Sequence, residues 1–208
     1  MNLDELQKKV ESLEEEVKTL KDIEQINRLQ RSYGYYMDNL MYDDAADLFS
    51  EDASAEFGST VNIGRERIRN SFRNMLTGPA FKDIKMLYLH MQLQGIVHCE
   101  PGGKAAKGRW QMLCLSTDYL GEPPGELEAI ISHGVYENEY VKQEDIWKIK
   151  KFVFNSSFHS TLKDGWAKKV ELLRTYPGKG DVVRNVGGRT YRSGYKVPYH
   201  FKNPVSGK

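Results

Sequence analysis

The chain has 208 residues, of which 39% are hydrophobic, and its 30 basic and 29 acidic residues leave a net charge of +1. This length suits one domain with extensions, and the charge gives no electrostatic reason to expect a nucleic acid or an anionic membrane as partner. The sequence has neither a signal-peptide pattern nor an apolar stretch long enough for a membrane span, so we expect a cytoplasmic protein. Its two cysteines, Cys99 and Cys114, form neither a disulfide framework nor a metal-binding spacing.

Residues 1–21 have the pattern of a short coiled coil. Their apolar residues are spaced alternately by three and four positions, at Leu3, Leu6, Val10, Leu13, Val17 and Leu20. About three heptads are marginal as an isolated helix. We therefore expect this leader helix to pack either on its own domain or on a partner subunit, which makes a homo-oligomer the favoured state.

A series of helices follows the leader, and it opens the domain proper. The apolar stripe slips in phase after Leu20 and predicts a separate helix over 22–40. A second, short helix is predicted over 43–49 and a short strand over 53–57. A third helix begins after Gly64, with Ile68, Phe72 and Met75 facing inward.

From residue 85 the apolar period changes from helical to alternating. Four long strands are predicted over 86–99, 106–119, 127–142 and 146–160, with Gly- and Pro-rich or polar turns between them. Long strands joined by short turns predict a strongly bent antiparallel meander. The fold class is therefore α+β, with the helices packed on one face of the sheet. Residues 161–208 are predicted to form an extended tail.

Two residues are candidates for acid–base chemistry. Asp38 lies near the end of a helix that is otherwise aromatic and aliphatic, and a carboxylate there is costly to bury without a partner. His90 opens a polar face of an alternating strand, which period two predicts to hold His90, Gln92, Gln94, Ile96 and His98. Each has an ordinary alternative: a solvated carboxylate at a helix end, and a surface histidine or a buried one with its hydrogen bonds made.

Other chemical motifs are weak or absent in the sequence. The remaining strand histidines have no metal-ligand spacing, so we expect no metal site. No P-loop, dinucleotide fingerprint or nucleophile elbow is present, and the glycine-rich segments fall in predicted hairpin turns.

Taken in order, several segments resemble a known superfamily. The run KDIEQINRLQRSYGYYMDNLMYDDAADLFSEDA, then GRERIRNSF, LHMQ and GRW, is similar to nuclear-transport-factor-2-like proteins. More narrowly, residues 1–160 resemble the SnoaL-like group, which includes bile-acid 7α-dehydratase and scytalone dehydratase. The resemblance implies a cone-shaped barrel, with helices closing a curved sheet around an internal active site. It also implies catalysis without metal or organic cofactor.

The resemblance also implies roles for particular residues. Tyr33 and Asp38 match a Tyr/Asp pair on the family's first helix, and His90 matches its strand histidine. His90 is then the general base, with an ordinary pKa of about 6.5. Asp38 orients it, and Tyr33, with Tyr36, polarises a carbonyl or protonates the leaving group. Cys114 stands where the related dehydratase has an aspartate.

The substrate implied by these residues is a small apolar or aromatic molecule, steroid-like or phenolic. Walls for such a ring compound are expected from Tyr36, Phe57, Trp110, Met112 and Cys114. The favoured reaction is a dehydratase-type elimination. An isomerase, a cyclase, a retro-aldol lyase and a non-catalytic binding protein remain alternatives. Among oligomers, the resemblance favours a trimer over a dimer.

Overall fold

The computed structural model describes residues 1–75, 87–120, 126–168, 180–183 and 193–208. Helix α1 (Leu3–Asp38) is followed by α2 (Tyr42–Asp47), β1 (Phe49–Phe57), β2 (Thr60–Ile63) and α3 (Arg65–Met75). Four long strands come next: β3 (Tyr88–Cys99), β4 (Ala105–Leu120), β5 (Glu126–Gln143) and β6 (Ile146–Thr161). The short elements α4 (Gly165–Lys168) and β7 (Val182–Val183) complete the described chain.

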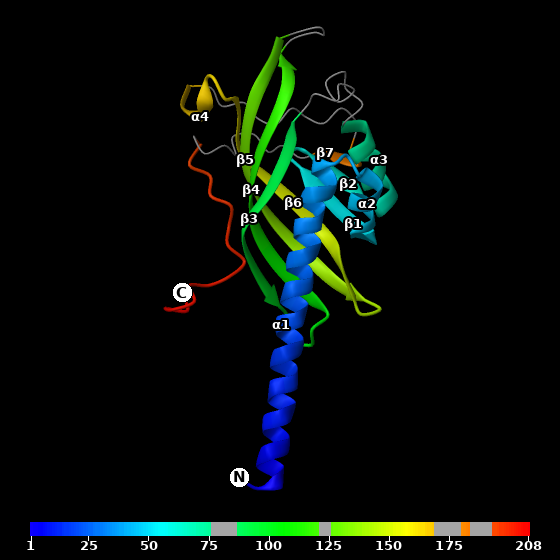
Figure 1. Cartoon of the computed structure of the whole chain (residues 1–208), viewed down its shortest axis with the longest axis vertical. Helices are drawn as coiled ribbons and strands as arrows, with labels where there is room; N and C mark the ends of the chain where they lie inside the picture. The colour runs from blue at the N-terminus through cyan, green and yellow to red at the C-terminus, as the bar shows by residue number, and fades with distance from the viewer. Residues whose placement is uncertain (76–86, 121–125, 169–179, 184–192) are drawn as a thin grey trace.

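The strands form one seven-stranded sheet in the order β3-β4-β5-β6-β1-β2-β7. The meander from β3 to β6 is antiparallel, as predicted, whereas β1 pairs with β6 in parallel. The sheet is strongly curved and does not close, because β3 and β7 remain its edges (Figure 1). The α+β prediction of helices packed on one curved sheet is therefore confirmed.

Helix α1 is a single element, whereas the sequence predicted a break between a leader and a domain helix. It begins with a capping box, in which the Asn2 side chain accepts from the Glu5 amide at 2.8 Å and the Asn2 amide donates to Glu5 at 3.0 Å. The slip of the apolar stripe near Leu20 marks a change of surroundings instead. Every residue up to Lys18 is exposed, and from Asp22 onward one face of the same helix is buried against the sheet.

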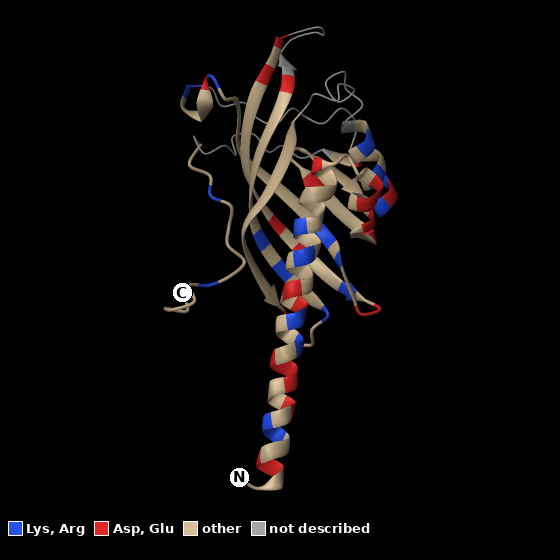
Figure 2. Cartoon of the chain, viewed as in Figure 1, with Lys and Arg blue, Asp and Glu red and all other residues tan. Residues whose placement is uncertain are grey.

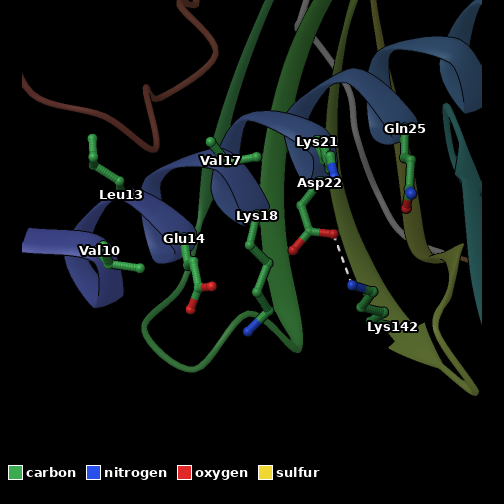
Figure 3. A pocket seen from close by; sticks show the side chains of 9 residues that line it. All are labelled: Val10, Leu13, Glu14, Val17, Lys18, Lys21, Asp22, Gln25 and Lys142. Carbon is green, nitrogen blue, oxygen red and sulfur yellow. Dashed lines mark hydrogen bonds and ion pairs between the residues drawn. The ribbon is translucent and has the colours of Figure 1, made fainter. Parts of the chain in front are cut away.

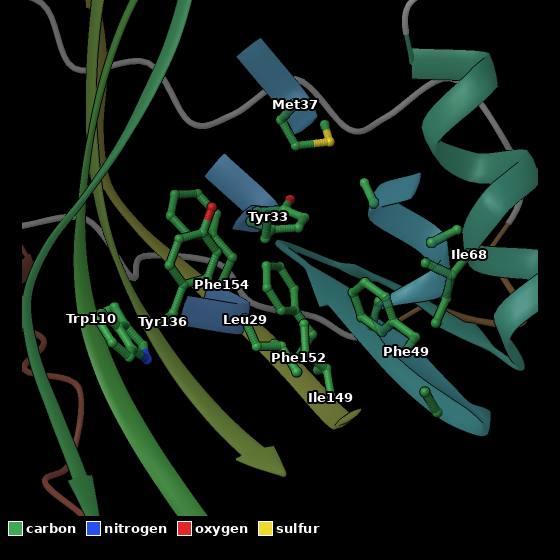
Figure 4. Close-up of a cluster of buried hydrophobic side chains, with 14 of the residues drawn as sticks. Leu29, Tyr33, Met37, Phe49, Ile68, Trp110, Tyr136, Ile149, Phe152 and Phe154 are labelled. Atoms are coloured by element: carbon green, nitrogen blue, oxygen red, sulfur yellow. The ribbon is translucent and has the colours of Figure 1, made fainter. Parts of the chain in front are cut away.

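The core lies between the helices and the face of the sheet that α1 covers, here called the inner face (Figure 4). Aromatic rings fill it, with Phe152 at 4.8 Å from Tyr33 and 5.6 Å from Phe49 between ring centroids. Ile68 and Phe72 of α3 are fully buried there, as predicted. The side chain of Met75 lies outside the described residues. So does Met86, the first residue of the strand predicted over 86–99.

A β-bulge in β3 corrects the predicted face of that strand. The register with β4 shifts between Leu93 and Ile96, and Gln94 has a positive φ of 47°. Gly95 allows this bulge because a Cβ there would lie 2.1 Å from the Trp110 ring. His90 and Gln92 therefore share the inner face, but Ile96 and His98 are turned to the outer face.

The end of the predicted tail packs on that outer face. The Arg109 guanidinium lies 4.2 Å from the Tyr199 ring centroid and donates to the carbonyls of Val197 and Pro198 at 3.3 and 3.1 Å. Glu137 accepts from Arg109 and lies 2.8 Å from His200 Nδ1. Among the described residues, no helix is both long enough and apolar enough to span a bilayer.

Candidate functional site

Asp38 and His90 meet where the end of α1 lies beside the edge strand β3. The backbone N–H of His90 donates to Asp38 Oδ1 at 2.5 Å, and His90 Nδ1 lies 3.7 Å from the same oxygen. One carboxylate oxygen therefore holds both the main chain and the ring of the histidine. The 3.7 Å contact is an ion-pair distance, and Nδ1 is buried with no hydrogen-bond partner among the described residues.

The position of Asp38 is electrostatically unusual. It is the last residue of α1, where the free carbonyl groups of a helix disfavour a negative charge, and that last turn carries no basic residue. The amide of His90 on the edge strand compensates, because an edge strand leaves such N–H groups without a ladder partner. An acid in this place is thus held by its contact with His90.

Gly34 lets the helix approach the strand closely enough for this contact. A Cβ at Gly34 would lie 2.7 Å from the His90 carbonyl oxygen and 3.0 Å from Gln92 Cγ. The first distance is shorter than any normal packing contact, and a backbone atom cannot move aside cheaply. Glycine at this position therefore fixes the spacing of α1 and β3, and with it the spacing of Asp38 and His90.

The surroundings of His90 make it an unusually strong base. Burial of the imidazole works against its charged form, but Cys114 and Asp38 beside it outweigh burial and raise the pKa of His90 to about 9. The expected ordinary value for this histidine is therefore wrong. The physical reason is that two potential anions lie next to the ring, and only one of them, Asp38, is recognisable as a partner from the sequence.

His90 belongs to a row of polar residues that crosses four strands. Sheet register places His90 opposite Cys114, Cys114 opposite Ser132, and Ser132 opposite His159. Directly opposite residues point to the same face, so the four side chains line the inner face side by side. Ser132 Oγ and His159 Nδ1 are hydrogen-bonded at 2.6 Å. The row thus has an imidazole at each end, and the Cys114 thiol and the Ser132 hydroxyl lie between the two imidazoles.

A second polar network lies further along α1 and ties the helix to the sheet. Gln30 Nε2 donates to Gln92 Oε1 at 2.8 Å, and Gln30 Oε1 accepts from Tyr140 OH at 2.8 Å and from Asn138 Nδ2 at 3.0 Å. Trp110 Nε1 donates to the same tyrosine oxygen at 3.0 Å. Because Gln92 is two residues from His90 on the same face, this network fixes the strand that carries the histidine.

The other predicted site residues divide into two groups. Met112 and Cys114 lie on the inner face beside His90, since Met112 is opposite Gln92 and Cys114 is opposite His90. Tyr33 and Phe57 instead join the aromatic core, where both contact Phe72 and Phe152.

The last two predicted wall residues lie elsewhere in the core. Tyr36 is half-buried against the core from α1. Trp110 is buried in the Gln30 network, over Gly95.

Sequence reasoning missed Ser132, His159, Gln30 and Tyr42. The first two alternate correctly within their strands, but only the register between strands brings them to His90. Gln30 could have been noticed as a polar residue on the buried stripe of α1. The Tyr42 hydroxyl is buried with no hydrogen-bond partner among the described residues, and burial raises its pKa above the ordinary value. Within the described ranges, no three His, Cys, Asp or Glu side chains converge as metal ligands would.

A long helix packed on an open, curved sheet, with an acid at the helix end against a strand histidine, defines a small α+β domain of the NTF2-like type. The chain belongs to the SnoaL-like domain family, whose model matches residues 18–153. The match begins within the exposed part of α1 and ends in β6. No curated protein sequence matches the chain significantly.

Several solved structures have the same fold, among them the following three. A type 2 hexachlorocyclohexane dehydrochlorinase (LinA) is 19% identical, with a TM-score of 0.59 over 71% of this chain and 93% of its own. A candidate scytalone dehydratase from Novosphingobium aromaticivorans DSM 12444 is 19% identical, with a TM-score of 0.56 over 69% of this chain and 89% of its own.

The third is an NTF2-like protein with a cystatin-like fold from Novosphingobium aromaticivorans. It is 18% identical, with a TM-score of 0.52 over 75% of this chain and 92% of its own. At such identities these likenesses show a shared fold.

Proposed function

We propose that this protein is a lyase that acts without an organic cofactor on a small, apolar, ring-containing molecule, steroid-like or phenolic, with His90 as general base. The observation that carries the proposal is the contact of Asp38 with both the amide and the ring of His90. The names of two similar structures, a dehydrochlorinase and a candidate dehydratase, both describe eliminations. In each, removal of a proton accompanies departure of a leaving group.

The proposed reaction begins with proton removal by neutral His90. The imidazole takes a proton from the carbon next to the one that bears the leaving group. The electrons of that C–H bond form the carbon–carbon double bond, and the leaving group departs with its own bonding pair. Asp38 stabilises the imidazolium that forms and keeps the ring oriented, as a carboxylate does beside a catalytic histidine.

The high pKa of His90 suits this role. A base of pKa about 9 can remove a less acidic proton than an ordinary histidine can, although little of it is unprotonated at neutral pH. Tyr33 and Tyr36 are proposed to polarise the substrate or protonate the leaving group. Met112 and Cys114 on the inner face, with Phe57 and Trp110 deeper in the core, are proposed to give the apolar surroundings that favour a ring compound.

Paired substitutions test the assignment. We expect Asp38→Asn and His90→Ala each to lower turnover by about 10²–10⁴-fold, the usual contribution of one positioned acid–base group. Glu24→Gln is a matched control on the exposed face of α1, and His98→Ala is a matched control on the outer face of β3. The assay uses scytalone and hexachlorocyclohexane as probes and follows loss of water or of hydrogen chloride by mass. Near-normal turnover in both site variants on any converted substrate would refute the assignment.

The polar row favours one alternative reaction. Because Ser132 and His159 form a second proton-carrying pair on the inner face, a proton removed by His90 could be returned at another carbon. That reaction is an isomerisation, which leaves the substrate mass unchanged. A cyclase starts with removal of a proton from carbon, whereas a retro-aldol lyase starts with removal of a hydroxyl proton, and mass analysis of the product distinguishes both from elimination. A binding protein without catalysis predicts ligand binding and no product.

A further inference from the structure

The first part of α1 projects from the body of the molecule as an exposed helix (Figure 1). All residues up to Lys18 are exposed, and the first buried residue of the helix is Asp22, which binds Lys142 and Trp147 at 2.8 and 2.9 Å. A helix of this length without packing is marginal in water. Its amphipathic stripe therefore indicates a surface that another helix covers.

The stripe consists of large apolar side chains on one side of this helix. Their exposed fractions run from 44% at Leu6 to 78% at Leu3, with Val10, Leu13 and Val17 between them. Val10, Leu13 and Val17 also line a groove of about 460 Å³, together with Lys18 and Asp22 of the same helix and Lys142 of β5 (Figure 3). The stripe therefore continues without interruption to the point where the helix meets the sheet.

We propose that residues 3–20 pair with the same segment of a second copy of this chain as a parallel, two-stranded coiled coil. In heptad notation the a positions are Leu3, Val10 and Val17, and the d positions are Leu6, Leu13 and Leu20. β-branched residues at a with leucine at d favour two strands over three or four. The residue types thus argue for a dimer, in contrast to the trimer that the family resemblance favoured.

The flanking charges favour the parallel orientation. In a parallel pair, each g position faces the e position of the next heptad on the other helix. Lys9 then faces Glu14 of the partner subunit, and Glu16 faces Lys21 of the partner subunit, so all charged g–e pairs are attractive. Among the described residues, none of these four forms an ion pair within its own chain. Figure 2 shows the two signs of charge interspersed along this part of the helix.

Sedimentation equilibrium of the full chain, from low to several hundred micromolar, tests the proposal. We expect twice the chain mass for the wild type and a monomer for Val10→Asp, which places a charge in the stripe. Ser12→Asp adds the same charge to the same helix outside the stripe and should remain a dimer. Because Val10 is 45% exposed and precedes the first buried residue of the helix, thermal unfolding of the body should match in all three proteins at concentrations too low for dimerisation. A wild-type monomer, a trimer, or a dimer that survives Val10→Asp would overturn the proposal.

Charge exchange tests the orientation. Lys9→Glu alone and Glu14→Lys alone each turn two attractive pairs of the dimer into repulsive ones and should raise the dissociation constant roughly tenfold. The double variant Lys9→Glu/Glu14→Lys should restore the wild-type value, because the exchanged charges attract again in a parallel pair. In an antiparallel pair, Lys9 would instead face Glu16 of the partner subunit, and the double variant would stay weak. Absence of rescue therefore contradicts the parallel arrangement.

Discussion

At the scale of single residues, the central feature is one carboxylate oxygen that serves both the amide and the ring of His90. The amide contact fixes where the histidine stands, and the ring contact contributes to its raised pKa. Gly34 is the residue that makes this possible, since any side chain there would push the strand away from the helix. The contact with Asp38 therefore fixes the position of the proposed base and, together with Cys114, raises its basicity.

The raised pKa of His90 predicts opposite pH trends for activity and stability. A general base acts when it is neutral, so kcat/KM should rise about tenfold per pH unit above neutrality and level off near pH 9. The pKa is higher in the folded protein than the ordinary 6.5, so His90 contributes stability that is complete below pH 6.5. That contribution should be lost as pH rises through about 9.

Two measurements check these trends. An NMR titration of the His90 ring should give the high pKa directly, and urea unfolding across the same pH range should show the loss of stability. In Asp38→Asn the pKa should fall, and the activity profile should level off at lower pH. An unchanged His90 titration in that variant would contradict the role assigned to Asp38.

At the scale of elements, α1 and the C-terminal segment hold the sheet from opposite faces. The inner face carries the Gln30 network and the Asp22–Lys142 pair, whereas the outer face carries Arg109 and Glu137 under residues 197–200. Burial raises the pKa of Asp22, but its bonds to Lys142 and Trp147 outweigh burial and hold this pKa below the ordinary value. Its contribution to stability is thus present above that ordinary value and is lost as pH falls through the lowered one.

The C-terminal segment depends on Arg109, which supplies both the cation over Tyr199 and the donors to two carbonyl groups. Arg109→Ala should release residues 193–208 from the outer face without unfolding the domain, because the side chain packs outside the core. Trypsin should then cleave at the exposed Lys196 and Lys202 roughly ten times faster. As the control, Arg28→Ala removes the same kind of side chain from the exposed side of α1, away from this segment, and should be cleaved at the wild-type rate. Equal rates in both variants would show that Arg109 does not hold the segment.

At the scale of the whole molecule, the exposed leader and the folded body are physically separable. The family model begins at residue 18, and no residue before Asp22 is buried. A chain that begins at residue 18 should therefore fold, and its Tm should lie within about 2 °C of that of the dilute full chain.

The dependence of Tm on protein concentration distinguishes the contribution of the leader from that of the body. The Tm of the full chain should rise with protein concentration, because dimerisation stabilises the folded state by mass action. The Tm of the shortened chain should not depend on concentration. Loss of cooperative unfolding in the shortened chain would show that the leader is part of the domain.

The sequence by itself determined the second and third helices, the four long strands nearly to the residue, and the heptad stripe. All of these are local: periods of two, three and a half and 3.6 residues can be read within a single segment. The sequence also identified Asp38 and His90 as candidates, through resemblance to a family. It could not show that Ser132 and His159 lie on the same face as His90, because the register between strands decides which residues are neighbours.

Only the tertiary structure decided which residues share the inner face with His90. The bulge at Gln94, made possible by Gly95 under Trp110, turns His98 away from the face that strict alternation gave it. The shift of the apolar stripe near Leu20 suggested two helices, whereas the structure has one continuous helix whose later part is buried against the sheet. The raised pKa of His90 likewise depends on Asp38 and Cys114, which lie 52 and 24 positions away in the chain and meet the ring only after folding. Local periodicity carries no information about such contacts, because they depend on how separate elements pack and align.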